Sequence, residues 1–101
     1  MDPGIPDFLI GDVVMATAGR DKGQLFYVIN LEQTYLYLVN GKDRTLEKPK
    51  RKKFKHAQKV LRSETRVAEK LRLGDKVLNS ELRRDLACIS RDMQSNNLGG
   101  F

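Results

Sequence analysis

Residue types that build catalytic and metal sites are scarce in this chain of 101 residues, which has one cysteine, one histidine and no tryptophan. One cysteine and one histidine exclude the usual zinc sites, and Cys88 cannot form an internal disulfide bond. Because Cys88 lies beside Ile89 in an apolar stripe, we expect a small buried residue, with a reactive thiol as the alternative. No nucleophile motif or phosphate-binding glycine loop accompanies His56, so we expect no catalytic residue, metal, cofactor or enzymatic activity.

Long hydrophobic runs are absent too. No apolar stretch is long enough to span a bilayer. The first four residues, Met1 to Gly4, lack the positive region and the apolar run of a signal peptide. We therefore expect a cytoplasmic protein that does not associate with membranes.

Negative charge is missing from one long segment. The net charge is +6, and the segment from Lys48 to Arg62 contains eight basic residues and no acidic one. This segment therefore carries +8 and the rest of the chain −2. Such a local patch binds phosphate polymers or anionic membrane surfaces. The sequence has neither a lipidation signal nor an amphipathic helix with a basic face. We therefore expect a phosphate polymer as the ligand, with a membrane surface as the less favoured alternative.

The first two thirds of the chain have the pattern of short strands. Asn40-Gly41 is typical of a two-residue type I′ hairpin turn, and Pro49 interrupts the pattern that follows it. Five short strands with tight turns favour a small closed barrel, because closure removes the free edges of so small a sheet. The predicted strands are residues 8–16, 24–30, 35–39, 44–47 and 54–60.

After Arg62 the pattern changes to helix. Ser63 is the expected cap of a helix over residues 64–72 that Gly74 ends, and Asn79 or Ser80 is the expected cap of a second helix over residues 80–93. The second helix carries an apolar stripe that we expect to pack on its own domain, with docking on a partner as the alternative. The stripe consists of Leu82, Leu86, Ile89 and Met93.

These patterns predict a mainly β protein with one barrel and a helical tail. Because the predicted strands precede the tail, a chain that ends near Leu61 is expected to stay folded. The predicted divisions are a flexible N-terminus (1–7), the barrel (8–61), a helical tail (62–94) and a disordered C-terminus (95–101).

The start of the predicted barrel contains Gly11-Asp12, the loop Gly19-Arg20-Asp21-Lys22-Gly23 and Val28, with Val14 and Ala16 at the inward apolar positions. This set of residues resembles the KOW motif of ribosomal proteins and transcription elongation factors. Phe26 stands where many KOW sequences have a glycine, although some large-subunit ribosomal proteins of eukaryotic and archaeal type also carry bulky residues in this strand. The similarity covers about residues 10 to 60 and extends to short bacterial KOW-domain RNA-binding proteins. It implies an SH3-like barrel whose first loop contacts RNA.

The resemblance and the basic segment together predict a protein that binds structured RNA, with ribosomal RNA as the expected ligand, ribosomal proteins as further partners and a monomeric state. Lysine and arginine neutralise phosphates and release counterions, which gives affinity without reading sequence. The predicted RNA-binding residues are Arg20, Lys22, Lys42, Arg44, Lys48, Lys50, Arg51, Lys52, Lys53, Lys55, His56 and Lys59.

Three aromatic residues near these cations have two interpretations. Phe54 is expected in the core, with stacking on an unpaired base as the alternative. Tyr35 and Tyr37 fit an exposed stacking surface and simple strand propensity equally well. The alternative function is a protein-interaction module of the translation or transcription machinery, because SH3-like barrels often bind peptides.

Overall fold

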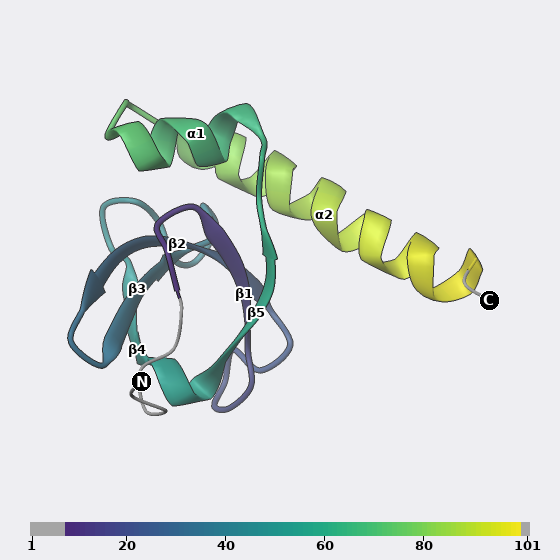
Figure 1. The fold of residues 1–101 in the computed structure, drawn as a ribbon, viewed down its shortest axis with the longest axis horizontal. Coiled ribbons are helices and arrows are strands. Elements are labelled where there is room, and N and C mark those ends of the chain that lie inside the picture. The colour runs from purple at the N-terminus through teal and green to yellow at the C-terminus, as the bar shows by residue number, and fades with distance from the viewer. Residues whose placement is uncertain (1–7, 100–101) are drawn as a thin grey trace, which may run out of the picture.

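The chain folds into a five-stranded antiparallel sheet followed by two helices (Figure 1). A computed structural model describes the backbone of residues 8–99 and the side chains of residues 8–94. The predicted flexible N-terminus and the last two residues of the predicted disordered C-terminus lie outside the described residues. The elements are β1 (Asp12–Ala16), β2 (Leu25–Glu32), β3 (Tyr35–Val39), β4 (Lys50–Lys53), the 3₁₀ helix η1 (Phe54–His56), β5 (Ala57–Arg62), α1 (Arg66–Leu73) and α2 (Asn79–Gly99).

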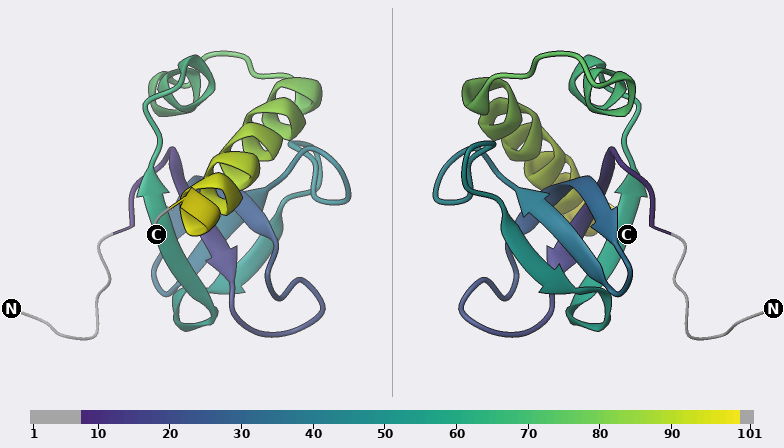
Figure 2. Two further views of the ribbon diagram at one scale, coloured as in Figure 1. Left: turned by 90° about the vertical axis from the view of Figure 1, so that its right-hand side faces the viewer. Right: turned by 90° about the vertical axis from the view of Figure 1, so that its left-hand side faces the viewer.

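The sheet is strongly curled. Its strand order is β4-β3-β2-β1-β5, so two strands that follow each other in the chain lie at opposite edges. A flat sheet of this size would hold its outer strands about 19 Å apart, whereas a single 3₁₀ turn advances the chain by only about 6 Å. The backbone N–H of Phe54 donates to Thr34, and that of Thr17 donates to His56, so η1 is fastened to two other segments. The sheet therefore curls so that the end of β4 and the start of β5 come close to each other at η1, without pairing (Figure 2).

The predicted closed barrel is wrong in one respect, because β4 and β5 are not paired with each other and both sheet edges stay open. The predicted third strand, residues 35–39, is confirmed. The predicted fourth strand, residues 44–47, is wrong: these residues form turns, and the fourth strand is the basic segment Lys50–Lys53. Lysine has a low strand propensity, but it is a common residue on open sheet edges, where it discourages further pairing.

The predicted type I′ turn at Asn40-Gly41 is also wrong. Asn40 begins a longer loop, in which its side-chain Oδ1 accepts hydrogen bonds from the backbone N–H groups of Lys42 and Arg44. The tight hairpin lies instead between β2 and β3, where Gln33 has a positive φ of 52°. Gly41 has a φ of 78°, and a Cβ atom there would lie 2.2 Å from the carbonyl oxygen of Asn79. The β3–β4 loop is thus packed directly on the start of α2.

Successive side chains of the strands point to two separate cores, as the period of a strand requires. Val14, Phe26 and Leu38 belong to the inner core, which lies inside the curled sheet. Phe54 packs against this core, in agreement with the first of its two predicted roles.

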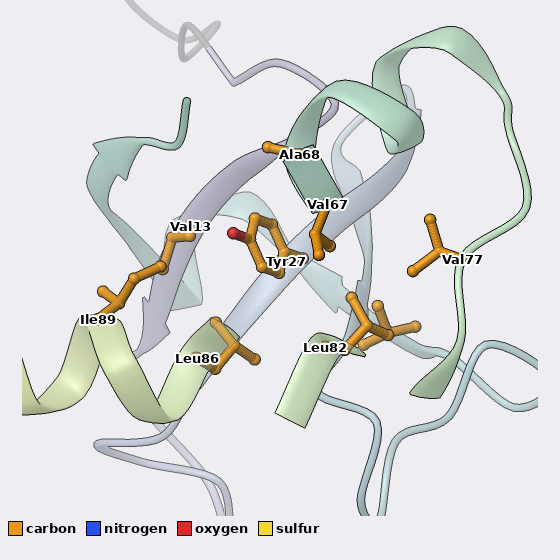
Figure 3. Packing of buried hydrophobic residues seen from close by; sticks show 9 residues of the cluster. Val13, Tyr27, Val67, Ala68, Val77, Leu82, Leu86 and Ile89 are labelled. Carbon is orange, nitrogen blue, oxygen red and sulfur yellow. The ribbon is translucent and has the colours of Figure 1, made fainter. Parts of the chain in front are cut away.

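The outer core lies between the sheet and the helices. Tyr27 sits at its centre, with Val13 and Val39 as the other sheet residues (Figure 3). The helical part of the chain contributes the other six buried residues, which are Val67, Ala68, Val77, Leu82, Leu86 and Ile89. Packing of the apolar stripe on its own domain is therefore confirmed, and the tail completes a core that the sheet cannot close alone.

The helix ends follow the sequence signals only in part. The predicted cap of the second helix is wrong, because α2 already includes Asn79 and Ser80, and Asn79 Oδ1 accepts a hydrogen bond from the backbone N–H of Leu46. Thr65, not Ser63, caps α1, because its hydroxyl accepts a hydrogen bond from the backbone N–H of Ala68. Gly74 ends α1 in the left-handed conformation. The backbone of α2 is helical as far as Gly99, beyond the predicted end at residue 93. The prediction that Cys88 is buried is wrong, because its side chain is exposed. The buried residues of α2, Leu82, Leu86 and Ile89, lie on another face of the helix.

A buried hydrogen-bond network joins α2 to the sheet. The Tyr27 hydroxyl lies 2.5 Å from Asp85 Oδ2 and 2.8 Å from Ser63 Oγ, and the Thr65 hydroxyl donates to the same carboxylate. Tyr27 is fully buried. Burial, followed by the hydrogen bond to Asp85, raises the pKa of Tyr27 from 10.0 to about 12.

This raised pKa predicts alkaline destabilisation. The unfolded chain loses the Tyr27 proton near pH 10 and the folded chain near pH 12, so the stabilisation is complete below pH 10 and is lost as the pH rises to about 12. The loss amounts to about 3 kcal/mol at most. Chemical denaturation of the parent and of Tyr27→Phe between pH 10 and about 12 checks this prediction. The variant should be less stable than the parent, but its free energy of unfolding should lack the part of the pH dependence that comes from Tyr27. Parallel losses in the two proteins would contradict the prediction.

Candidate nucleic-acid interface

The loop between β1 and β2, residues 17–24, presents two of the predicted cations. Gly19 and Gly23 both have positive φ, which lets the loop turn sharply. Arg20 and Lys22 are exposed at its surface. Asp21, between them, is buried and forms an ion pair with Arg44 at 3.7 Å. Two loops that the sequence treats separately are thereby joined.

The strand β4 is the centre of the basic surface. Its register places Arg51 opposite Tyr37 and Lys53 opposite Tyr35, while Leu36 and its neighbour Leu38 point into the inner core. Arg51 and Lys53 are exposed. Two cations therefore project from the outer face of an edge strand, about 7 Å apart.

The two tyrosines of β3 belong to the same outer face. The guanidinium carbon of Arg51 lies 4.4 Å from the centre of the Tyr35 ring, which is a cation–π contact. The Tyr37 hydroxyl donates to Glu32 at 2.5 Å, and this hydrogen bond raises the pKa of Tyr37. Both rings are partly exposed. The arrangement combines flat aromatic surfaces with positive charge, as surfaces that bind unpaired bases do.

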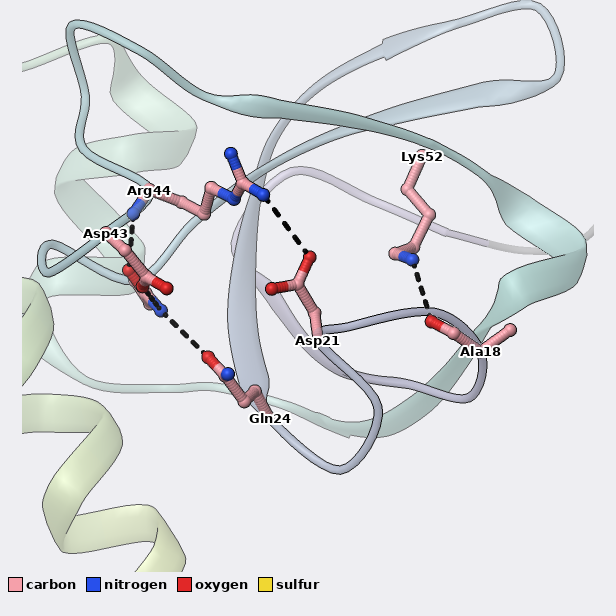
Figure 4. A network of polar contacts seen from close by, with 7 residues as sticks. Ala18, Asp21, Gln24, Asp43, Arg44 and Lys52 are labelled. Carbon is pink, nitrogen blue, oxygen red and sulfur yellow. Dashed lines mark hydrogen bonds and ion pairs between the residues drawn. The ribbon is translucent and has the colours of Figure 1, made fainter.

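Lys52 connects β4 to the first loop. Its side chain turns away from solvent, and Nζ donates to the carbonyl oxygen of Ala18 at 3.1 Å (Figure 4). Arg44 reaches Asp21 from the other side of the same loop (Figure 4). The first loop is held between β4 and the β3–β4 loop, so the cations of all three segments form one surface.

Lys59 has a structural contact that the sequence did not indicate. The carboxylate of Asp12 is fully buried, and it lies 3.3 Å from Lys59 Nζ and 3.7 Å from Arg62. It also accepts a hydrogen bond from the backbone N–H of Leu9. Both basic partners belong to β5, so these ion pairs fasten β5 to β1. The position of Asp12 between Gly11 and a buried apolar strand indicates that its carboxylate needs a partner. The sequence does not identify Lys59 as that partner, because the two residues are far apart in the chain.

The twelve predicted RNA-binding residues thus fall into two groups. Arg44, Lys52 and Lys59 hold the fold together, Arg51 packs on Tyr35, and His56 is half-buried in η1. The remaining seven make no ion pair within the described residues: Arg20, Lys22, Lys42, Lys48, Lys50, Lys53 and Lys55.

One cation that is not among the twelve predicted residues lies beside the site. Arg83 of α2 donates from Nη1 to the carbonyl oxygen of Gly41 at 2.6 Å. It lines a groove together with Lys42 of the β3–β4 loop. No sequence signal distinguishes Arg83 from the neighbouring Arg84, because only the packing of α2 on the loop brings it there.

Other kinds of site find no support in the described part of the chain. Among residues 8–94, no cluster of three histidine, cysteine, aspartate or glutamate side chains could hold a metal ion. None of the helices described has the length and apolar composition needed to cross a membrane. No protein-family model matches the chain, and a search of curated proteins gives no match either.

Proposed function

We propose that this chain is an RNA-binding protein that docks on structured RNA through its first loop and β4. The observation that carries the proposal is the edge strand Lys50–Lys53, in which four consecutive residues are basic. Lys50 and Lys53 make no ion pair within the described residues, and Arg51 faces outward beside two tyrosines. So dense a patch is self-repelling, and a polyanion relieves that repulsion.

The fold supports an SH3-like domain of the KOW type. Five antiparallel strands curl so that η1 joins the two edges, and the loop with the KOW-like glycines lies next to the basic strand. In this proposal, Arg20 and Lys22 contact phosphates from the first loop, Lys42 and Lys48 from the second, and the β4 cations dominate the affinity. The spacing of Arg51 and Lys53 is comparable to that of neighbouring phosphates along a nucleic-acid strand.

Ribosomal RNA in the cytoplasm is the proposed ligand, and the proposal gives the protein no catalytic role. Folded RNA suits this surface because duplex RNA is recognised through phosphates and shape, while its base edges are hidden in a deep major groove. The rival function, a protein-interaction module, loses its main surface: Leu82, Leu86 and Ile89 of α2 are buried against the sheet.

The salt dependence of binding tests the proposal. If about five phosphates are neutralised, the log–log slope of affinity against salt should be about −3.5 to −4.5, and a rise from about 50 to about 200 mM salt should cost on the order of 10²-fold in affinity. A titration of the full chain with a structured ribosomal RNA fragment at several salt concentrations measures this slope. An affinity that is independent of salt would contradict docking through phosphates.

A further inference from the structure

A groove lies between the two cationic loops and the part of α2 that follows its contact with the β3–β4 loop. It has a volume of about 450 Å³ and is lined by the end of the β1–β2 loop, by the β3–β4 loop and by one face of α2. This volume is within the range of about 300 to 1,000 Å³ typical of small-ligand sites. The end of the first loop lines the groove, and the start of the same loop contacts β4, so one loop borders both the groove and the basic surface.

The lining of the groove combines apolar side chains with two cations. Leu25 of β2 and the exposed Ala87 of α2 supply most of the apolar surface, and Leu86, which is only 7% exposed, adds little to it. Lys42 and Arg83 supply two cations, and no acidic residue lines the groove. A nucleotide has the complementary chemistry, since its base is a flat apolar ring and its phosphate is an anion.

One amide in the groove has hydrogen-bonding capacity to spare. The Oδ1 atom of Asn40 accepts from two backbone N–H groups, and its Nδ2 atom donates to Asp43, so this amide is committed to the loop. Gln24 is exposed, and within the described residues its side-chain amide makes one hydrogen bond, a long one of 3.4 Å that Oε1 accepts from Asn40 Nδ2. Its amide therefore has both a donor and an acceptor to offer to the edge of a base (Figure 4).

We propose that this groove binds one unpaired nucleotide of the RNA. The base lies against Ala87 and Leu25, Gln24 contacts its edge, and Lys42 and Arg83 hold the phosphate. This inference rests on the proposed function and adds a preference to it. A base within a duplex is paired and stacked and cannot enter the groove, so the protein selects RNA with an unpaired loop or bulge next to a helix.

The test compares two substitutions on α2 that add the same negative charge. Ala87→Glu fills the groove, whereas Gln94→Glu lies two helical turns away on an exposed position outside it. Both positions are exposed and glutamate favours helix, so both variants keep the fold. The probes are a hairpin RNA with an unpaired loop and a blunt duplex with the same stem.

The parent protein is expected to bind the hairpin about tenfold more tightly than the duplex, because burial of one base face against apolar side chains contributes on this scale. Ala87→Glu should remove that preference while binding the duplex as Gln94→Glu does. Gln24→Ala, in an exposed loop, should reduce the preference without any change to α2. Equal hairpin affinities for Ala87→Glu and Gln94→Glu, or no preference in the parent, would overturn the groove site and leave the proposed function standing. A parent that binds neither RNA would overturn both.

Discussion

Replacing Lys50, Arg51 and Lys53 with glutamine is expected to lower the affinity for structured RNA on the order of 10²-fold near physiological salt, since three phosphate contacts are lost. The slope of affinity against salt should flatten by about two units, at about 0.7 to 0.9 per contact. Lys52 is left unchanged, because its side chain fastens β4 to the first loop through Ala18. Filter-binding or fluorescence titrations at several salt concentrations measure both effects.

The matched control removes three cations from the helices. Arg66, Arg84 and Arg91 are exposed and make no ion pair within the described residues. Their replacement with glutamine gives the same net charge as the β4 variant and should lower the affinity only slightly. Both variants should melt like the parent, because exposed charged side chains contribute little to stability. Equal losses of affinity in the two variants would show that net charge, and not the β4 surface, drives binding.

A chain that ends at Leu61 is expected to lose its fold. Sequence patterns alone suggest that the β region is self-sufficient, but six of the nine buried residues of the outer core lie beyond this point. Truncation would expose Val13, Tyr27 and Val39. Burial of each such side chain contributes about 1.5 to 3 kcal/mol, and their sum is comparable to the total stability of a small domain, about 5 to 15 kcal/mol. The dispersion of the amide NMR spectrum and the thermal melt by circular dichroism measure the effect.

The control for this truncation is a chain that ends at Gln94. It keeps every residue of the outer core, including Ile89 and the partly buried Met93. It should therefore keep a dispersed spectrum and a cooperative melt. A dispersed spectrum and a cooperative melt for the chain that ends at Leu61 would contradict the role assigned to the helices.

The success of sequence reasoning depended on how local each signal was. The third strand, the Gly74 stop and the apolar stripe of α2 follow from short-range patterns, and the structure contains all three. The strand β4 could not be predicted, because a run of basic residues with low strand propensity is typical of an exposed loop. It becomes a strand only because it pairs with the edge of β3. The turn at Asn40-Gly41 failed for a related reason: the Asn40 side chain stabilises a longer loop that packs on α2.

The candidate site shows the same division. A dense basic segment and a glycine-bounded loop are visible in the sequence, and the structure places them side by side. The sequence does not show that Asp12 and Asp21 are buried. Nor does it show that Asp12 forms an ion pair with Lys59 and Asp21 one with Arg44, so that these two cations stabilise the fold. Nor does it show that Arg83 reaches the loop at Gly41. Each of these contacts joins residues that are distant in the chain, so packing alone decides them.

The most direct test of RNA docking through the basic surface is ultraviolet crosslinking of the full chain to RNA in cells, followed by mapping of the crosslinked peptides. Cleavage after glutamate yields the peptides 33–47 and 48–64, which contain Tyr35 and Tyr37 in the first and the β4 cations in the second. Peptides that begin at residue 65 or later come from the helices. We predict that crosslinked ribosomal RNA is recovered on the peptides 33–47 and 48–64. Crosslinks confined to the helical peptides, or no RNA above the level of an unirradiated sample, would contradict the account.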